Sequence, residues 1–286
     1  MQKINLLVTS LLHSGTLVTG YCRFRHSFTK LTIMLIFNFK IALRSLWKNR
    51  TFSFVNIFGL ALSVACCLVL AIYLFSELSY DRFHRDHQNI YRITGTQLQA
   101  GSAYEVAVTP GPLAPALQKD LPAVKNIVRI QSWGGLLKTG GKSAETNQML
   151  IADHSFLNIF DFGIVKGDSS RMLNSPDDMV VTESMAARLF GADWQTQPDI
   201  FQRVLTLEGQ KEFRLSGVLK DPPANSSIRF EALLPLSWLL TTDKWANKWN
   251  SNNYHTYLQL PSETKPRLFE KQMTAVLHKN NPGNTD

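Results

Sequence analysis

The first 76 residues contain no aspartate or glutamate, and residues 51–76 carry no charged side chain at all. Across the whole chain, 30 lysines and arginines outnumber 22 acids, which gives a formal net charge of +8. The excess matches the eight cations that precede Thr51, which are Lys3, Arg23, Arg25, Lys30, Lys40, Arg44, Lys48 and Arg50. Because the rest of the chain is neutral overall, the basicity does not indicate nucleic-acid binding, and no nucleic-acid partner is expected.

Cysteine is also scarce. The three cysteines are Cys22, Cys66 and Cys67, and none follows residue 67. A disulfide therefore cannot stabilise residues 77–286, and no CxxC pair predicts a metal or redox site there. The adjacent cysteines lie inside an apolar run, where they are interpreted as small apolar side chains.

That apolar run is the most informative feature present. Residues Phe52–Phe75 form 24 mainly apolar positions, and a helix needs about 20 to cross a bilayer. We therefore predict a transmembrane helix over residues 51–76. Cationic flanks stay in the cytoplasm, so the N-terminal side is expected to be cytoplasmic and residues 77–286 external. The basic flank is expected to contact membrane lipid.

Two segments precede the predicted span. Residues 1–33 contain a short apolar run without a clear cleavage site, and they are interpreted as an extension upstream of a natural start at Met34. Residues 34–50 place apolar side chains at helical spacing, with Lys40 and Arg44 on the opposite side. This pattern predicts an amphipathic helix along the cytoplasmic membrane face.

Residues 77–286 predict an α+β domain with mixed sheets, because strand-like and helix-like segments alternate. Strands are predicted over Ile90–Thr94, Tyr104–Thr109, Ile127–Ser132, Gln148–Ala152, Met179–Thr182, Val204–Leu207, Phe213–Leu219 and Tyr254–Leu260. Helices are predicted over Thr109–Asp120 (capped by Thr109), Ser155–Phe160, Ser184–Phe190 and Lys265–Leu277. A polar helical stalk is expected to continue the span over Glu77–Asn89. Glu208-Gly209-Gln210 predicts a hairpin turn.

The motifs that could carry chemistry are incomplete. Gly140-Gly141-Lys142-Ser143 lacks the first glycine of a phosphate-binding loop at the required spacing, so it is interpreted as a hairpin turn. His84 and His87 supply only two zinc ligands and are interpreted as part of a hydrated stalk. Asp153-His154-Ser155 is no triad by adjacency alone, and no Gly-x-Ser-x-Gly elbow exists. We predict no enzyme, no cofactor, and no catalytic, cofactor-binding or metal-binding residue.

Two other patterns are open to a functional interpretation. Asn225-Ser226-Ser227 matches a glycosylation acceptor, which means little in a bacterial cell. Trp238, Trp245, Trp249 and Tyr254 could form a binding surface, although a role in the core or between lobes is the more common one.

An ordered series of motifs resembles the permease subunits of ABC transporters of the MacB/FtsX-like family, in their long two-module bacterial form. The motifs are Phe39–Leu46, Lys48-Asn49, Phe52–Leu62, Glu77–His84, Ile90–Arg92, Pro112–Leu117, Phe156–Phe162, Lys166–Asp168, Val180–Ala186, Phe190-Gly191 and Gly217–Pro223. The resemblance covers about 220 residues from Met34 onward. It implies an N-terminal transmembrane helix followed by a mixed α/β, two-lobed periplasmic core domain, residues 77–286, in the bacterial inner membrane.

The resemblance also implies function and partners. A cytosolic ABC ATPase would close on ATP, and membrane helices would carry the motion to the periplasmic domain for export or mechanotransmission. A second permease copy or module and a periplasmic adaptor are further expected partners. The family pattern has three more spans after the external domain, so we expect this chain to be a truncated permease with an incomplete C-terminal part.

Two alternatives are kept. The first is a single-pass membrane-anchored ligand-binding or sensor protein, although only about 50 residues would be available as a cytoplasmic output domain. The second is a membrane-anchored hydrolase, which would need a nucleophile elbow or a metal cluster that the sequence does not contain.

Overall fold

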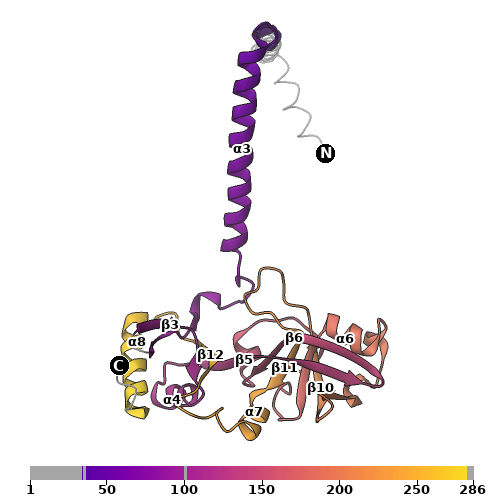
Figure 1. Cartoon of the computed structure of the whole chain (residues 1–286), viewed down its shortest axis with the longest axis vertical. Helices are drawn as coiled ribbons and strands as arrows, with labels where there is room; N and C mark the ends of the chain where they lie inside the picture. Colours follow the sequence, from indigo (N-terminus) through magenta and orange to yellow (C-terminus); the bar gives the residue numbers. More distant parts are fainter. Residues whose placement is uncertain (1–33, 35–36, 100–101, 282–286) are drawn as a thin grey trace, which may run out of the picture. The chain divides into compact units, whose positions relative to one another are not determined.

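The computed structural model describes residues 34, 37–99 and 102–281. Contacts divide the chain into two units, Met1–Phe75 and Ser76–Asp286, and each is described on its own. In the first unit, residues 37–48 are helical, where the sequence predicts an amphipathic helix. After a turn at Asn49, helix α3 runs over Arg50–Leu78 (Figure 1). The predicted N-terminal extension, residues 1–33, lies outside the described residues.

Helix α3 has 29 residues and is apolar on every side. Phe52, Leu60 and Phe75 expose 72, 68 and 75% of their surface. The hydroxyl of Ser63 donates to the carbonyl oxygen of Gly59 at 2.8 Å, so this polar group is satisfied inside the helix. Within the described part of the chain, α3 is the one helix long and apolar enough to cross a membrane. Such a surface is stable in hydrocarbon rather than in water.

The second unit is a mixed α/β domain, as predicted. Its strands are β1 Ile90–Arg92, β2 Gly95–Gln99, β3 Ser102–Val106, β4 Thr109–Pro110, β5 Asn126–Thr139, β6 Lys142–Ala152, β7 Ile164–Gly167, β8 Asp178–Thr182, β9 Val204–Leu207, β10 Lys211–Leu219, β11 Ala232–Pro235 and β12 Asn252–Gln259. Its α-helices are α4 Leu113–Asp120, α5 Phe156–Ile159, α6 Glu183–Phe190, α7 Leu236–Thr242 and α8 Pro266–Asn280. Short 3₁₀ helices are η1 His87–Asn89, η2 Trp194–Thr196 and η3 Ile200–Gln202.

One large sheet organises the domain, in the order β1-β12-β5-β6-β11-β8-β10-β7. The β11–β6 and β10–β8 pairs are parallel, and the other pairs are antiparallel. β9 pairs with both β10 and β5, so the strands β5, β6, β11, β8, β10 and β9 close into a ring. β2 and β3 form a separate hairpin. The closed pairing leaves few free edges in this half of the sheet.

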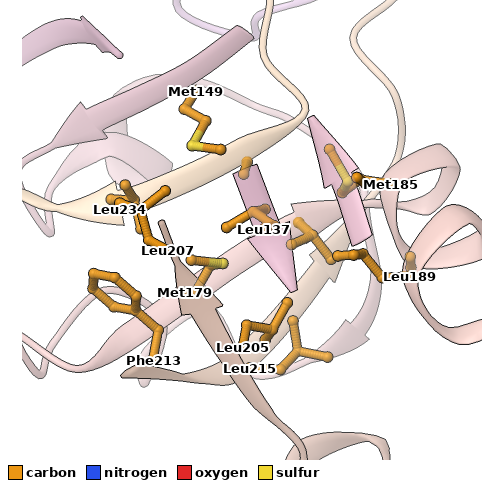
Figure 2. Close-up of a cluster of buried hydrophobic side chains, with 14 of the residues drawn as sticks. Leu137, Met149, Met179, Met185, Leu189, Leu205, Leu207, Phe213, Leu215 and Leu234 are labelled. Atoms are coloured by element: carbon orange, nitrogen blue, oxygen red, sulfur yellow. The ribbon is translucent and has the colours of Figure 1, made fainter. Parts of the chain in front are cut away.

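Both faces are buried along β8 and β11 and at the ends of β6 and β10, so apolar residues run continuously there instead of alternating. On β6, Met149 and Ile151 join one core, whereas Leu150 and Ala152 join the other. Figure 2 shows the first core, in which Leu137, Met149 and further side chains from the strands converge with Met185 and Leu189 of α6. The second core is rich in phenylalanine and includes the short helix α5.

A third core lies at the other end of the sheet. It joins α4 and α8 to the strands β5 and β12 through Leu113, Leu117, Ile127, Leu258 and Phe269. Figure 1 shows α4, α8, β3 and β12 gathered at one end of the domain and α6, β10 and β11 at the other. One continuous sheet therefore runs from one end of the domain to the other.

Most predicted elements are present, and the turns behave as predicted. Glu208 and Gly209 have φ angles of 53° and 68° and, with Gln210, form the turn that connects β9 to β10. Gly140 and Gly141 have φ angles of 50° and 81° and connect β5 to β6, so this segment is a hairpin turn. The N-cap of α6 is Thr182, whose hydroxyl accepts from the Met185 amide at 3.4 Å.

The predicted cap at Thr109 is wrong. Thr109 lies in β4, and its buried hydroxyl contacts the Tyr254 carbonyl oxygen at 3.2 Å and the Thr256 hydroxyl at 2.6 Å. α4 begins four residues later, with Pro112 as its N-cap. The Thr109 hydroxyl therefore contacts residues of the distant strand β12 instead of capping α4.

Candidate functional site

The segment that follows α3 in the chain packs onto the folded domain, and we call Ser79–Asn89 the junction segment. The predicted stalk helix over Glu77–Asn89 is wrong, because α3 ends at Leu78. Asp81 has a left-handed backbone with φ 57°, which continued helix does not allow. Its amide donates to the Asn225 carbonyl oxygen at 2.9 Å instead of to a helical partner.

The loop that follows β10 holds the first part of the junction segment. The Asp81 carboxylate accepts from the Ser227 amide at 2.8 Å, and the Asn225 side-chain amide donates to the Ser79 carbonyl oxygen at 2.9 Å. Asn225 therefore bonds the junction segment through both its backbone and its side chain. The proposed glycosylation acceptor is thus a structural asparagine in this fold, with Ser226 buried beside it.

His84 holds the middle of the junction segment. Only 2% of its surface is exposed, so the interpretation of a hydrated stalk is wrong for this residue. Its ring lies 4.0, 5.3 and 5.4 Å from the rings of Phe83, Phe160 and Phe162. Nδ1 accepts from the Asp161 amide at 2.9 Å, which places the proton of the neutral ring on Nε2.

The protonation state of His84 is constrained by this environment. Burial among aromatic rings lowers its pKa from the ordinary value of 6.5, against the opposing effect of the nearby Asp81 and Asp161 carboxylates. Nε2 has no hydrogen-bond partner within the described residues. A protonated ring could not accept from the Asp161 amide, so the contact requires neutral His84.

Arg85 and Asp161 add a second contact next to His84. The Asp161 carboxylate accepts from the Arg85 amide at 2.8 Å and from Arg85 Nε at 2.7 Å. The guanidinium is 90% exposed, so the ion pair itself contributes little. The hydrogen bond from the Arg85 backbone amide contributes more, because it fixes the backbone of the junction segment to the corner between α5 and β7.

The last part of the junction segment joins the edge of the large sheet. Asp86 accepts from the Gln259 side-chain amide at 2.6 Å, and the Leu260 amide donates to the Asn89 carbonyl oxygen at 3.0 Å. β1 then pairs with β12 from Ile90 onward. The junction segment is therefore fastened to three separate parts of the domain: the loop after β10, the corner after α5 and the end of β12.

The motifs examined for chemistry are not assembled into a reactive site. The His87 ring lies 3.0 Å from the His84 carbonyl oxygen, and no group of three metal-binding side chains occurs among the residues with described positions. Asp153 pairs with Arg129, and the Ser155 hydroxyl donates to the Ile127 carbonyl oxygen, so Asp153-His154-Ser155 forms no triad.

The aromatic group is split between several places. Tyr254 is fully buried, where burial raises its pKa to about 12. Trp238 packs on the Phe213 and Trp133 rings, while Trp249 packs on the third core. Trp245 alone of the four is largely exposed, at 61%. No continuous aromatic binding surface results.

Sequence reasoning did not identify Asp161 or Asn225 as contacts of the junction segment. Both belong to short segments noted for other reasons, Phe156–Phe162 and the Asn225-Ser226-Ser227 acceptor. Their contacts span 76 and 146 residues of sequence, and no local pattern reports such pairing.

Residues 53–276 match the sequence profile of the MacB-like periplasmic core domain. The chain belongs to this family. It is thus a periplasmic-type domain of the MacB/FtsX-like ABC permease family, preceded by one candidate membrane helix. A search of curated proteins finds no match.

Solved structures resemble the MacB-like domain at the level of the fold. A domain of a protein described as a permease from Porphyromonas gingivalis is 22% identical, with a TM-score of 0.58 over 71% of this chain and 84% of that chain. The periplasmic region of MacB from Actinobacillus actinomycetemcomitans is 17% identical, with a TM-score of 0.46 over 59 and 73%. The extracellular domain of the noncanonic ABC-type transporter YknZ from Gram-positive bacteria is 16% identical, with a TM-score of 0.43 over 61 and 84%.

Proposed function

We propose that this protein is a permease subunit that transmits motion between a membrane helix and a periplasmic domain, driven by a cytosolic ABC ATPase. Membership of the MacB-like family supports the class of protein, and an ATPase partner follows from that class. In this proposal α3 spans the bacterial inner membrane with its N-terminal side in the cytoplasm. The reason is that the flank before Thr51 carries eight cations and no acid, and cationic flanks stay in the cytoplasm.

The observation that carries the mechanism is the way the junction segment is fastened. Hydrogen bonds from Asp81, His84 and Asn89 reach three different parts of the domain. A displacement of the segment would therefore pull on the loop after β10, the corner after α5 and the edge strand together. Packed interiors transmit such strain because they have little free volume. Export of a substrate or activation of a periplasmic partner would follow from this motion.

Other expected partners remain part of the proposal. The helix over residues 37–48 would lie along the cytoplasmic face in contact with inner-membrane lipid, since it is cationic and aromatic. A second permease copy or module would complete the transmembrane path, and a periplasmic adaptor could bind the domain. The proposed role involves no catalysis by this chain.

Topology is the first test of the proposal. A reporter fused after Arg50 should be active only in the cytoplasm, and one fused after Lys220 only in the periplasm. The reverse pattern, or the same compartment for both fusions, would refute the membrane arrangement.

Nucleotide-driven motion is the second test. The only cysteines are Cys22, Cys66 and Cys67, so a serine-substituted chain accepts one new cysteine for an environment-sensitive dye. A dye on Arg82→Cys, in a complex with the ATPase in lipid nanodiscs, should change its emission on ATP addition but not on ADP. The substitution Asn225→Ala should reduce the change. A stable complex with no ATP-dependent change would contradict mechanical coupling through the junction segment.

A further inference from the structure

A pocket lies at the end of the domain that contains the third core. Its cavity volume is about 320 Å³, and it is lined by parts of β2, β3, β4, α4, the segment before β12, and α8. Pockets for small molecules commonly have volumes from about 300 Å³ upward and mainly apolar walls. We call this feature the apolar pocket.

Apolar side chains make up about half of the residues that line the apolar pocket, and the others are neutral polar residues and one glycine. Ile93 and Leu113 are buried at its base, as members of the third core. Trp249, Met273 and Leu277 pack against the same core but are only half-buried. Their remaining apolar surface faces open space, which is unfavourable in water and would be covered by an apolar occupant. Methionine and tryptophan also adapt well to ligands of varied shape.

The described part of the lining carries no formal charge. Among the described residues that line the apolar pocket there is no aspartate, glutamate, lysine or arginine, in a chain where 18% of residues are charged. Among these same residues His278 is the one titratable side chain, and neutral hydrogen-bonding groups are supplied by residues such as Asn252 and Thr274. A charged ligand would lose its hydration without gaining an opposite charge. An uncharged ligand is therefore the one that this lining accepts.

The source of such a ligand is close along the chain. Ile93 in the pocket wall lies 15 positions along the chain from the end of α3 at Leu78. Even a fully extended chain of that length spans at most about 50 Å. If α3 is in a bilayer, the apolar pocket stays within that distance of a reservoir of aliphatic chains.

We propose that the apolar pocket binds an uncharged small amphiphile by enclosing its single aliphatic chain. Its neutral polar end would lie among the amide and hydroxyl groups of the lining. This site goes beyond the permease role; it rests on the proposed membrane placement of α3 but not on coupling to an ATPase, because binding can be measured without one.

Photocrosslinking of the full chain in lipid nanodiscs tests the site. The probe is a long-chain aliphatic alcohol that carries a photoactivated diazirine near the end of its chain, and adducts are mapped by mass spectrometry. The probe also enters the bilayer, so adducts on α3 provide an internal reference for its local concentration. We expect adducts on peptides that contain Trp249 or Met273, and competition by excess unmodified alcohol.

Matched variants on α8 decide whether the labelling is specific. Thr274 lines the pocket, is exposed and donates only to the Glu270 carbonyl oxygen of its own helix, so Thr274→Trp should block the pocket without disturbing the core. Ala275 is also exposed but does not line the pocket, so Ala275→Trp is the control. Relative to α3 adducts, pocket labelling should fall at least about tenfold in the first variant and less than about twofold in the second.

A second variant guards against misfolding. A Cβ added at Gly95, another lining residue, would meet no atom within 4 Å, so Gly95→Leu should also reduce labelling in a folded protein. Adducts confined to α3, or equal pocket labelling in Thr274→Trp and Ala275→Trp, would overturn the proposal. Either result would leave the topology and nucleotide experiments unaffected, so the two proposals fail separately.

Discussion

Substituting Asp161 with alanine should loosen the junction segment while leaving the domain folded. The carboxylate accepts from the Arg85 amide at 2.8 Å and from Arg85 Nε at 2.7 Å. A net hydrogen bond contributes about 1 kcal/mol, and an ion pair with an exposed partner adds at most about 0.5 kcal/mol. Asp161→Ala should therefore lower the local opening free energy by about 1–1.5 kcal/mol, because the Arg85 amide loses its acceptor.

Hydrogen exchange measures this local opening directly. A loss of about 1.4 kcal/mol raises the exchange rate of a protected amide about tenfold when opening and closing are fast relative to the chemical exchange step. The peptide that contains Arg85 should show this increase in the full chain in nanodiscs, whereas peptides from the centre of β5 and β6 should be unchanged. The contact between the Asp161 amide and His84 uses the backbone, so it survives the substitution.

The matched control is Arg85→Ala, corrected for the intrinsic exchange rate of alanine. It removes the 90% exposed guanidinium but keeps the bond between the backbone amide of residue 85 and the carboxylate. Exchange should rise by less than about threefold. If Arg85→Ala and Asp161→Ala accelerate exchange equally, the backbone bond is not what holds the segment. If Asp161→Ala changes nothing, the carboxylate does not fasten it at all.

Two further predictions concern stability. Because burial lowers the pKa of His84 below 6.5, the unfolded chain binds the proton more readily than the folded chain. The contribution of neutral His84 to stability should therefore be complete above about pH 6.5 and decrease as the pH falls toward the lowered pKa of the folded state. Lowering the pH from about 7.5 to 5 should reduce the thermal unfolding midpoint of the wild type more than that of His84→Phe, and an equal reduction in both would contradict this. Asp153→Ala should lower the free energy of unfolding by about 3–5 kcal/mol, because the Arg129 guanidinium, which is only 10% exposed, loses its carboxylate partner. Asp168→Ala removes an exposed ion pair and the hydrogen bonds that the carboxylate accepts from Ser170, so it should lower the unfolding midpoint much less than Asp153→Ala; similar midpoints for both alanine variants would refute the assignment of a buried pair.

Local patterns predicted the parts of this protein whose structure depends on near neighbours. The apolar run of α3 needs no partner segment to form a helix, because all its backbone bonds are internal. The α6 helix carries its own cap at Thr182 and its own stop at Gly191. The hairpin turn at Glu208-Gly209 likewise depends on a local residue, Gly209, which adopts positive φ without strain.

The elements that were missed are short and lack a local signal, each for its own reason. β11 is Ala232–Pro235, a short apolar run that ends in proline, and it shows no alternation because both of its faces are packed. β7, Ile164–Gly167, has only four residues and lies at the edge of the sheet. α7 begins directly after β11 without a side-chain cap, so no start signal precedes it.

The sequence alone determined the long apolar helix α3, a candidate membrane span, together with the α+β class and, through an ordered series of motifs, the family. These depend on composition and on spacing along the chain, which the residues carry directly. Only the tertiary structure showed that the residues after Leu78 pack onto the domain instead of continuing the helix. His84 and Asp161 are 77 residues apart, and each is polar enough to suggest exposure. His84 is buried by Phe160 and Phe162, which are far from it in the sequence and come close only in the folded chain. A local sequence pattern cannot predict such a contact.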